Sequence, residues 1–98
     1  MDQIIDALAA LGDTPDQVAD TMRTSGVRGL RDSPSIRNPI VRYLNRTLNI
    51  GGRLEVTAGG TALHLLLGGK VSELALPIPV QVFLDGFHRG LYPDLESG

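Results

Sequence analysis

Two Gly-Gly pairs, at residues 59–60 and 68–69, divide a stretch of the chain in which apolar and polar residues alternate. Alternation with a period of two is typical of β-strands with one buried face, and a Gly-Gly pair suits a two-residue hairpin turn. If both pairs form such turns, residues 53–58, 61–67 and 70–76 make an antiparallel meander. The rest of the chain must then cover one face of that sheet.

The register of this meander can be checked, because it has to bring apolar side chains to one face. With the first Gly-Gly pair as the loop, Val56 faces Leu63 and Leu54 faces Leu65, so the apolar faces coincide. The second turn fits less well, since it places Ser72 on that apolar face. We therefore predict two paired strands and a third, giving a two- to three-stranded sheet.

The opposite face of the predicted sheet offers two candidate sites. Leu66 lies beside Val71 there, and if both stay uncovered they form a modest apolar patch suited to self-association. Glu55, His64 and Glu73 align in one cross-strand row. Two carboxylates and an imidazole can bind a divalent metal, but a flat ladder is poor geometry for surrounding an ion. We expect a solvated ion pair there and no metal site.

Helical patterns occupy both sides of this stretch. Thr14-Pro15-Asp16-Gln17 is a capping box, Gly26 suits the end of the helix that follows, and Asn38-Pro39 suits the start of another over 39–48. The apolar residues at helical spacing are Ile4, Ile5, Leu8 and Leu11; Val18, Ala19 and Met22; Ile40, Val41, Leu44 and Leu48; and Val80, Phe83, Leu84, Phe87 and Leu91. We predict an α+β fold with three N-terminal helices, the meander and a C-terminal helix.

The length of 98 residues indicates a single compact domain over 1–98. Its expected parts are a helical part over 1–48, the meander over 53–76, a C-terminal helix over 78–91 and a frayed tail over 94–98.

The composition favours a cytoplasmic protein. There is no cysteine, which excludes disulfides and thiolate metal sites. The chain opens Met1-Asp2-Gln3 without a basic segment, and no apolar run approaches the length of a membrane span. We expect no membrane partner and no cofactor.

Charge is distributed unevenly along the chain. Residues 1–22 hold five aspartates and no basic residue, whereas residues 23–53 hold seven arginines against Asp32 alone. Either the acidic ends fold back and neutralise the arginines, or the arginines await an anionic partner. We favour internal neutralisation, because an acidic domain lacks the general positive field that nucleic-acid binding usually exploits.

The candidates for binding an anion or a partner lie in the loop over 26–38 and on the polar face of the helix over 39–48. Long polar side chains there can donate several hydrogen bonds to an anion or to a nucleic-acid edge. The loop has no Walker-type spacing and no glycine run, which argues against a phosphate loop. The candidate residues are Arg28, Arg31, Arg37, Arg42, Asn45 and Arg46.

Three functional classes are compatible with these patterns. We favour a small non-enzymatic interaction or regulatory module that binds a protein partner, or a second copy of itself, through the arginines or the exposed sheet face. The alternative is a winged-helix-like nucleic-acid binder that reads through the helix over 39–48, although the loop before that helix is far longer than a helix-turn-helix turn. A metal-dependent enzyme is the weakest, since two histidines and no cysteine supply no catalytic set.

Overall fold

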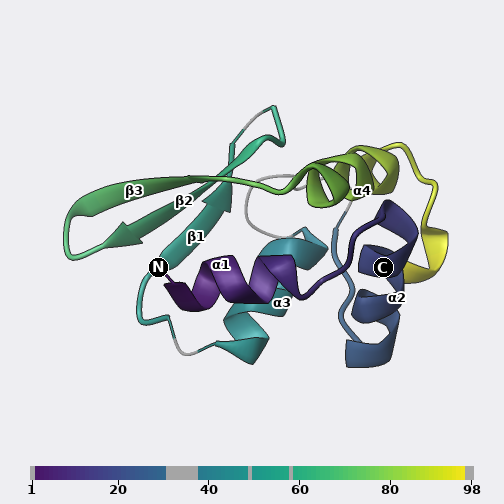
Figure 1. Ribbon diagram of the computed structural model, residues 1–98, viewed down its shortest axis with the longest axis horizontal. Coiled ribbons are helices and arrows are strands. Elements are labelled where there is room, and N and C mark those ends of the chain that lie inside the picture. Colours follow the sequence, from purple (N-terminus) through teal and green to yellow (C-terminus); the bar gives the residue numbers. More distant parts are fainter. Residues whose placement is uncertain (1, 31–37, 49, 58, 97–98) are drawn as a thin grey trace.

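The computed structural model describes residues 2–30, 38–48, 50–57 and 59–96. It has the predicted α+β architecture, with three helices before a three-stranded antiparallel sheet and one helix after it (Figure 1). In chain order the elements are α1 (Asp2–Ala9), α2 (Pro15–Ser25), α3 (Pro39–Thr47), β1 (Arg53–Val56), β2 (Ala62–Leu67), β3 (Lys70–Ala75), α4 (Ile78–His88) and the 3₁₀ turn η1 (Pro93–Leu95).

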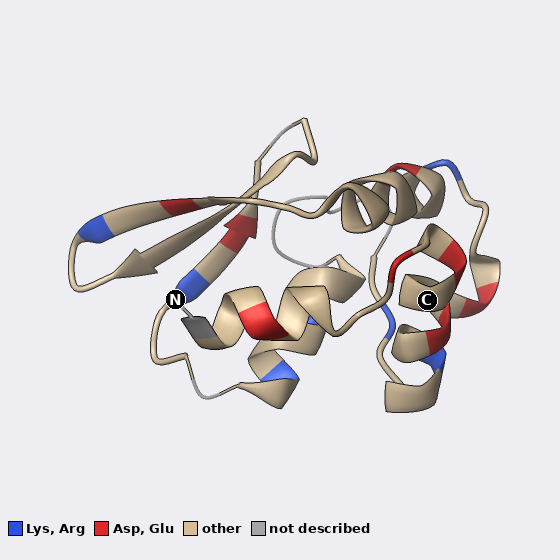
Figure 2. Cartoon of the chain, viewed as in Figure 1, with Lys and Arg blue, Asp and Glu red and all other residues tan. Residues whose placement is uncertain are grey.

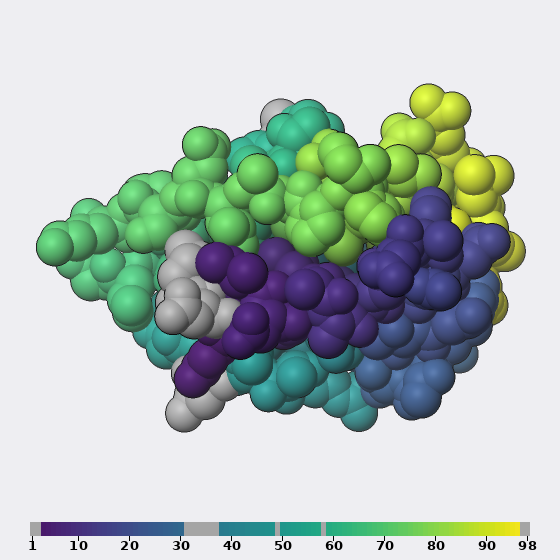
Figure 3. Space-filling model, viewed as in Figure 1, coloured from purple at the N-terminus to yellow at the C-terminus, as the bar shows by residue number. Residues whose placement is uncertain are grey.

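The sheet has the order β1-β2-β3 and the predicted register. Leu54 pairs with Leu65, Val56 with Leu63, and Leu63 in turn with Leu74. Gly68 and Gly69 both have positive φ, 59° and 79°, as a tight two-residue hairpin turn requires. This hairpin of β2 and β3 projects at one end of the molecule, as the space-filling view shows (Figure 3).

The hydrophobic core lies between one face of the sheet and the helices. α2 packs on α4 and on α3, and α3 also packs on β1. The core has no cysteine or tryptophan and is built mainly of aliphatic side chains around two phenylalanines. Its largest fully buried members are Phe83, Phe87, Leu8, Leu11, Met22, Ile40, Leu44, Leu54, Leu63, Leu84, Leu95 and Val18.

Both ends of α2 lie where the caps were predicted, although Gln17 bonds the N–H of Asp13 and not that of Thr14 as a standard capping box does. The Thr14 hydroxyl accepts a hydrogen bond from the Gln17 backbone N–H at 3.2 Å, and the Gln17 side-chain oxygen accepts one from the Asp13 N–H at 2.7 Å. At the other end Gly26 is left-handed, with φ 69°, and the Val27 N–H donates to the Met22 carbonyl at 3.0 Å. These bonds fix where the chain leaves α2.

The C-terminal segment differs from the prediction in two respects. The helix expected over 78–91 ends at His88, because Gly90 turns the chain with φ 83°, and Leu91 is 67% exposed instead of continuing the buried stripe. The tail expected to fray over 94–98 is docked over 94–96, because Leu95 is buried and its carbonyl accepts the Gly29 N–H at 2.9 Å. Residues 97–98 lie outside the described residues.

No helix in the described part of the chain has both the length and the apolar character that crossing a membrane requires.

Candidate anion-binding site

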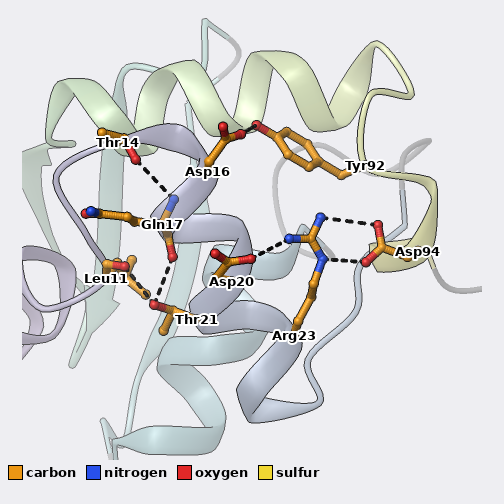
Figure 4. Close-up of polar contacts among 9 residues, drawn as sticks. All are labelled: Leu11, Thr14, Asp16, Gln17, Asp20, Thr21, Arg23, Tyr92 and Asp94. Atoms are coloured by element: carbon orange, nitrogen blue, oxygen red, sulfur yellow. Dashed lines mark hydrogen bonds and ion pairs between the residues drawn. The ribbon is translucent and has the colours of Figure 1, made fainter.

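Internal neutralisation accounts for some of the arginines. Arg23 at the end of α2 divides its guanidinium between two carboxylates, with Nη1 2.7 Å from Asp20 Oδ1 and Nε 2.5 Å from Asp94 Oδ2 (Figure 4). Two more arginine pairs lie in the described part of the chain, each with 3.1 Å between a guanidinium nitrogen and a carboxylate oxygen: Arg53 with Glu55 and Arg89 with Asp85.

A second group of arginines is not neutralised in this way. Arg28, Arg42 and Arg46 line one hollow of about 380 Å³ together with Gly26 and Val27, and we call it the arginine hollow. Within the described residues, none of these three guanidinium groups lies within 4 Å of a carboxylate. The hollow is therefore a concentration of positive charge on a chain whose net charge is −2.

The local fold explains why these three arginines meet. Arg42 and Arg46 are four residues apart on α3, so their side chains leave the same face of the helix. Arg28 comes from the segment after α2, and its carbonyl accepts a hydrogen bond from Arg42 Nη1 at 3.1 Å. A Cβ placed on Gly26 would lie 3.8 Å from Arg46 Nη1, so this cation sits beside the carbonyl end of α2, where positive charge is favoured.

The start of α3 is fixed by a buried polar cap. Asn38 is fully buried, and its side-chain oxygen accepts the Val41 N–H at 2.9 Å. Pro39 follows at the first helical position, as predicted. Gly29 passes so close to Pro39 that a Cβ there would lie 2.5 Å from the proline Cδ. This contact holds the segment that carries Arg28 against the helix that carries Arg42.

The structure brings together only part of the predicted binding set. Asn45 is exposed on α3 and does not line the arginine hollow. Arg31 and Arg37 lie outside the described residues. On the outer sheet face Leu66 is half-buried and Val71, its cross-strand neighbour, is 62% exposed, so their role in self-association stays a prediction.

The predicted row of Glu55, His64 and Glu73 is formed by the observed register. His64 Nε2 lies 3.0 Å from Glu73 Oε1, while Glu55 pairs instead with Arg53 at 3.1 Å. Among the described residues no group of three or more acidic, histidine or cysteine side chains is arranged to hold a metal ion. The row therefore holds one His64–Glu73 contact and one Arg53–Glu55 ion pair.

Sequence reasoning missed the docking of Asp94 and Leu95 next to this region, although it allowed for Tyr92-Pro93 packing back onto the fold. The Tyr92 ring packs at a tilt of 42° against the Phe83 ring, with centroids 5.0 Å apart, and its hydroxyl lies 3.4 Å from Asp16 Oδ1 (Figure 4). Leu95 is buried in the core, and Asp94 pairs with Arg23. One signal could have indicated this docking: Leu95 is an isolated apolar residue between two acids.

These contacts shift the titration of the groups involved. The hydrogen bond from Arg23 lowers the pKa of the Asp94 carboxyl below its usual range, and the charges of Arg23 and Arg28 act in the same direction. Asp94 and then Asp20 raise the pKa of the Arg23 guanidinium. Burial, and then the charge of Asp16, raise the pKa of the Tyr92 phenol.

Docking of the tail should therefore depend on pH. Because the pKa of Asp94 is lowered in the folded chain, its contribution is present above its ordinary pKa of about 4 and is lost as the pH falls through the lowered value. We expect the Gly29 amide, which donates to Leu95, to lose a few-fold of its hydrogen-exchange protection, corrected for intrinsic rates, over that range. An Asp94→Asn variant should lack this step, and an unchanged step in the variant would contradict the assignment to Asp94.

Comparison of the chain with protein-family models, with curated proteins and with solved structures finds no match.

Proposed function

We propose that this domain is a small non-enzymatic interaction module that binds an anionic group of a partner in the arginine hollow. One observation carries the proposal: Arg28, Arg42 and Arg46 gather around one hollow with no carboxylate of a described residue within 4 Å, while the other described arginines are paired. Guanidinium groups recognise carboxylates and phosphates through paired, charge-assisted hydrogen bonds. Holding three of them together, without such a partner, costs electrostatic free energy that a bound anion recovers.

A protein partner fits the surroundings of the hollow better than nucleic acid does. Acidic residues gather on α2 and in the C-terminal turn, which is η1 (Pro93–Leu95), and these two elements lie at the same end of the molecule (Figure 2). Arg28 itself lies close enough to Asp94 to influence its titration. A nucleic-acid duplex needs an extended basic surface that follows many phosphates. The carboxylates on α2 and in the C-terminal turn would repel those phosphates. The nucleic-acid alternative, with α3 as the reading helix, also has to bridge the long segment between Ser25 and Pro39.

The test is fluorescence anisotropy of a labelled oligoglutamate peptide, with a labelled mixed-sequence DNA duplex in parallel, at low and at moderate salt. We expect salt-sensitive binding of the peptide. Arg42→Glu and Arg46→Glu should each weaken it at least about tenfold, since each loses a charge-assisted hydrogen bond and adds a repulsive charge.

Arg53→Glu is the matched control, because it makes the same change of charge on the exposed outer sheet face, where Arg53 pairs with Glu55. It should alter peptide affinity far less than the two α3 variants. Absence of peptide binding at low salt, or equal losses in all three variants, would refute the arginine hollow as the site. Binding of the duplex alone would favour the nucleic-acid alternative.

A further inference from the structure

A second hollow adjoins the first. It has a volume of about 210 Å³ and lies between the end of α2 and the C-terminal turn, and we call it the tail hollow. The two hollows share Gly26, Val27 and Arg28 as a common wall. The residues lining the tail hollow are Arg23, Gly26, Val27, Arg28, Asp94 and Leu95.

The chain's own C-terminal turn docks beside this wall in the manner of a bound peptide. Its contacts include a carboxylate on an arginine, Asp94 on Arg23, and an apolar anchor, Leu95, which is 2% exposed. They also include a main-chain hydrogen bond, because the Gly29 N–H donates to the Leu95 carbonyl, and Gly29 forms an isolated parallel bridge with Glu96. Charge, an apolar anchor and main-chain hydrogen bonding are the elements by which protein surfaces recognise extended peptides.

We propose that the two hollows form one continuous ledge for an acidic polypeptide segment, and that the chain's own acidic turn occupies the part of the ledge next to Arg23. The inference rests on the proposed function and specifies its ligand. A partner segment supplies carboxylates to Arg28, Arg42 and Arg46, and it competes with Asp94 for the positive field at the shared wall. The C-terminal turn therefore fills part of the ledge and also lowers the affinity of the ledge for the partner segment.

Two observations favour a polypeptide ligand over another anion. First, the ledge already accepts an acid followed by a leucine, in Asp94-Leu95, within this chain. Second, Asp94 lines the tail hollow beside Arg23, and Asp20 pairs with the same arginine, so two carboxylates stand at one end of an otherwise basic ledge. A peptide can place carboxylates at the arginines and neutral residues opposite the aspartates, whereas a nucleic-acid backbone presents a phosphate at every nucleotide.

The test compares two variants that remove the same charge from exposed aspartates. Asp94→Asn removes the carboxylate next to Arg23 and Arg28, while Asp85→Asn removes one that pairs with Arg89 on α4. The probe is a labelled peptide that repeats Asp-Leu-Glu, the sequence of residues 94–96, measured by anisotropy at low salt. We expect Asp94→Asn to tighten binding about threefold or more, because a repulsive charge near the ligand is lost and Arg23 keeps only one of its two carboxylate partners, Asp20. Asp85→Asn should leave the affinity unchanged.

The outcomes separate this inference from the proposed function. If the unmodified chain binds the peptide and Arg42→Glu abolishes binding, yet Asp94→Asn has no effect or weakens it, the proposed function stands and the continuous ledge is refuted. If the unmodified chain binds no peptide, both fail. If duplex DNA binds as tightly as the peptide, with the same loss in Arg42→Glu, the assignment to a polypeptide ligand is overturned.

Discussion

Replacing Phe83 with alanine should lower the free energy of unfolding by about 3–5 kcal/mol, which is typical of removing a buried aromatic ring. Phe83 is completely buried on α4, with its ring centroid 6.3 Å from that of Phe87 and 5.0 Å from that of Tyr92. It thus supports both the core, in which α2 packs on α4, and the docked C-terminal turn. The cavity left by the ring would lie between these elements, so neither could collapse into it without moving the other.

Chemical denaturation followed by circular dichroism measures this loss. Val82→Ala is the matched control, because Val82 precedes Phe83 on the same helix and its side chain is half exposed. We expect the control to cost less than about 1 kcal/mol, in keeping with exposed positions. If the two variants lost similar stability, Phe83 would not hold the central place in the core that its burial indicates.

The sheet could be predicted from the sequence because its signals are local. The period of two and the glycine pair at 68–69 determine the second turn, and the requirement for one apolar face selects the register. The first turn was predicted less well: β1 ends at Val56, β2 begins at Ala62, and Gly59 lacks the positive φ of a type I′ or II′ turn. The expected pairing of Leu54 with Leu65 and of Val56 with Leu63 is the pairing observed. The caps of α2 and α3 were predictable for the same reason, since each depends on residues within one helical turn.

The C-terminal turn could not be predicted in this way. Its docking depends on contacts between residues far apart in sequence, such as Asp94 with Arg23 and Tyr92 with Asp16. A single leucine among acids carries no periodicity, so the acidic tail resembled a segment that frays. The contribution of Leu95 becomes visible only once the core beside α2 is formed.

The arginines of the candidate site could be predicted from the sequence, but which of them pair with carboxylates could not. The cluster of arginines in the middle of the chain is evident from the sequence. It allowed two alternatives, neutralisation by the chain's own carboxylates or binding of an anionic partner. Arg23 is neutralised because the docked tail brings Asp94 to it, whereas no carboxylate in the described part of the chain lies within 4 Å of the Arg28 guanidinium. Arg42 and Arg46 were expected on one helix face, but their meeting with Arg28 required the close contact at Gly29.

Replacing Gly29 with alanine should accordingly disturb the fold and the site together. A Cβ at this position would lie 2.5 Å from Pro39 Cδ, 2.6 Å from Pro39 N and 2.9 Å from the Asn38 carbonyl carbon. Two of these are backbone atoms at the capped start of α3, which cannot rotate away as a flexible side chain could. We expect a loss of about 2 kcal/mol or more in the free energy of unfolding, toward the upper part of the range for overpacked sites.

The accompanying effect on binding follows from the same displacement. To relieve the clash, the segment that carries Arg28 has to move away from α3, which breaks the hydrogen bond from Arg42 to the Arg28 carbonyl and opens the arginine hollow. Gly59→Ala is the matched control, since a Cβ there would approach nothing closer than 3.8 Å. The control should keep both stability and affinity for the oligoglutamate peptide. If Gly29→Ala proved as stable as Gly59→Ala and bound the peptide equally well, the contact at Pro39 would not be what assembles the three arginines, and their proximity would need another cause.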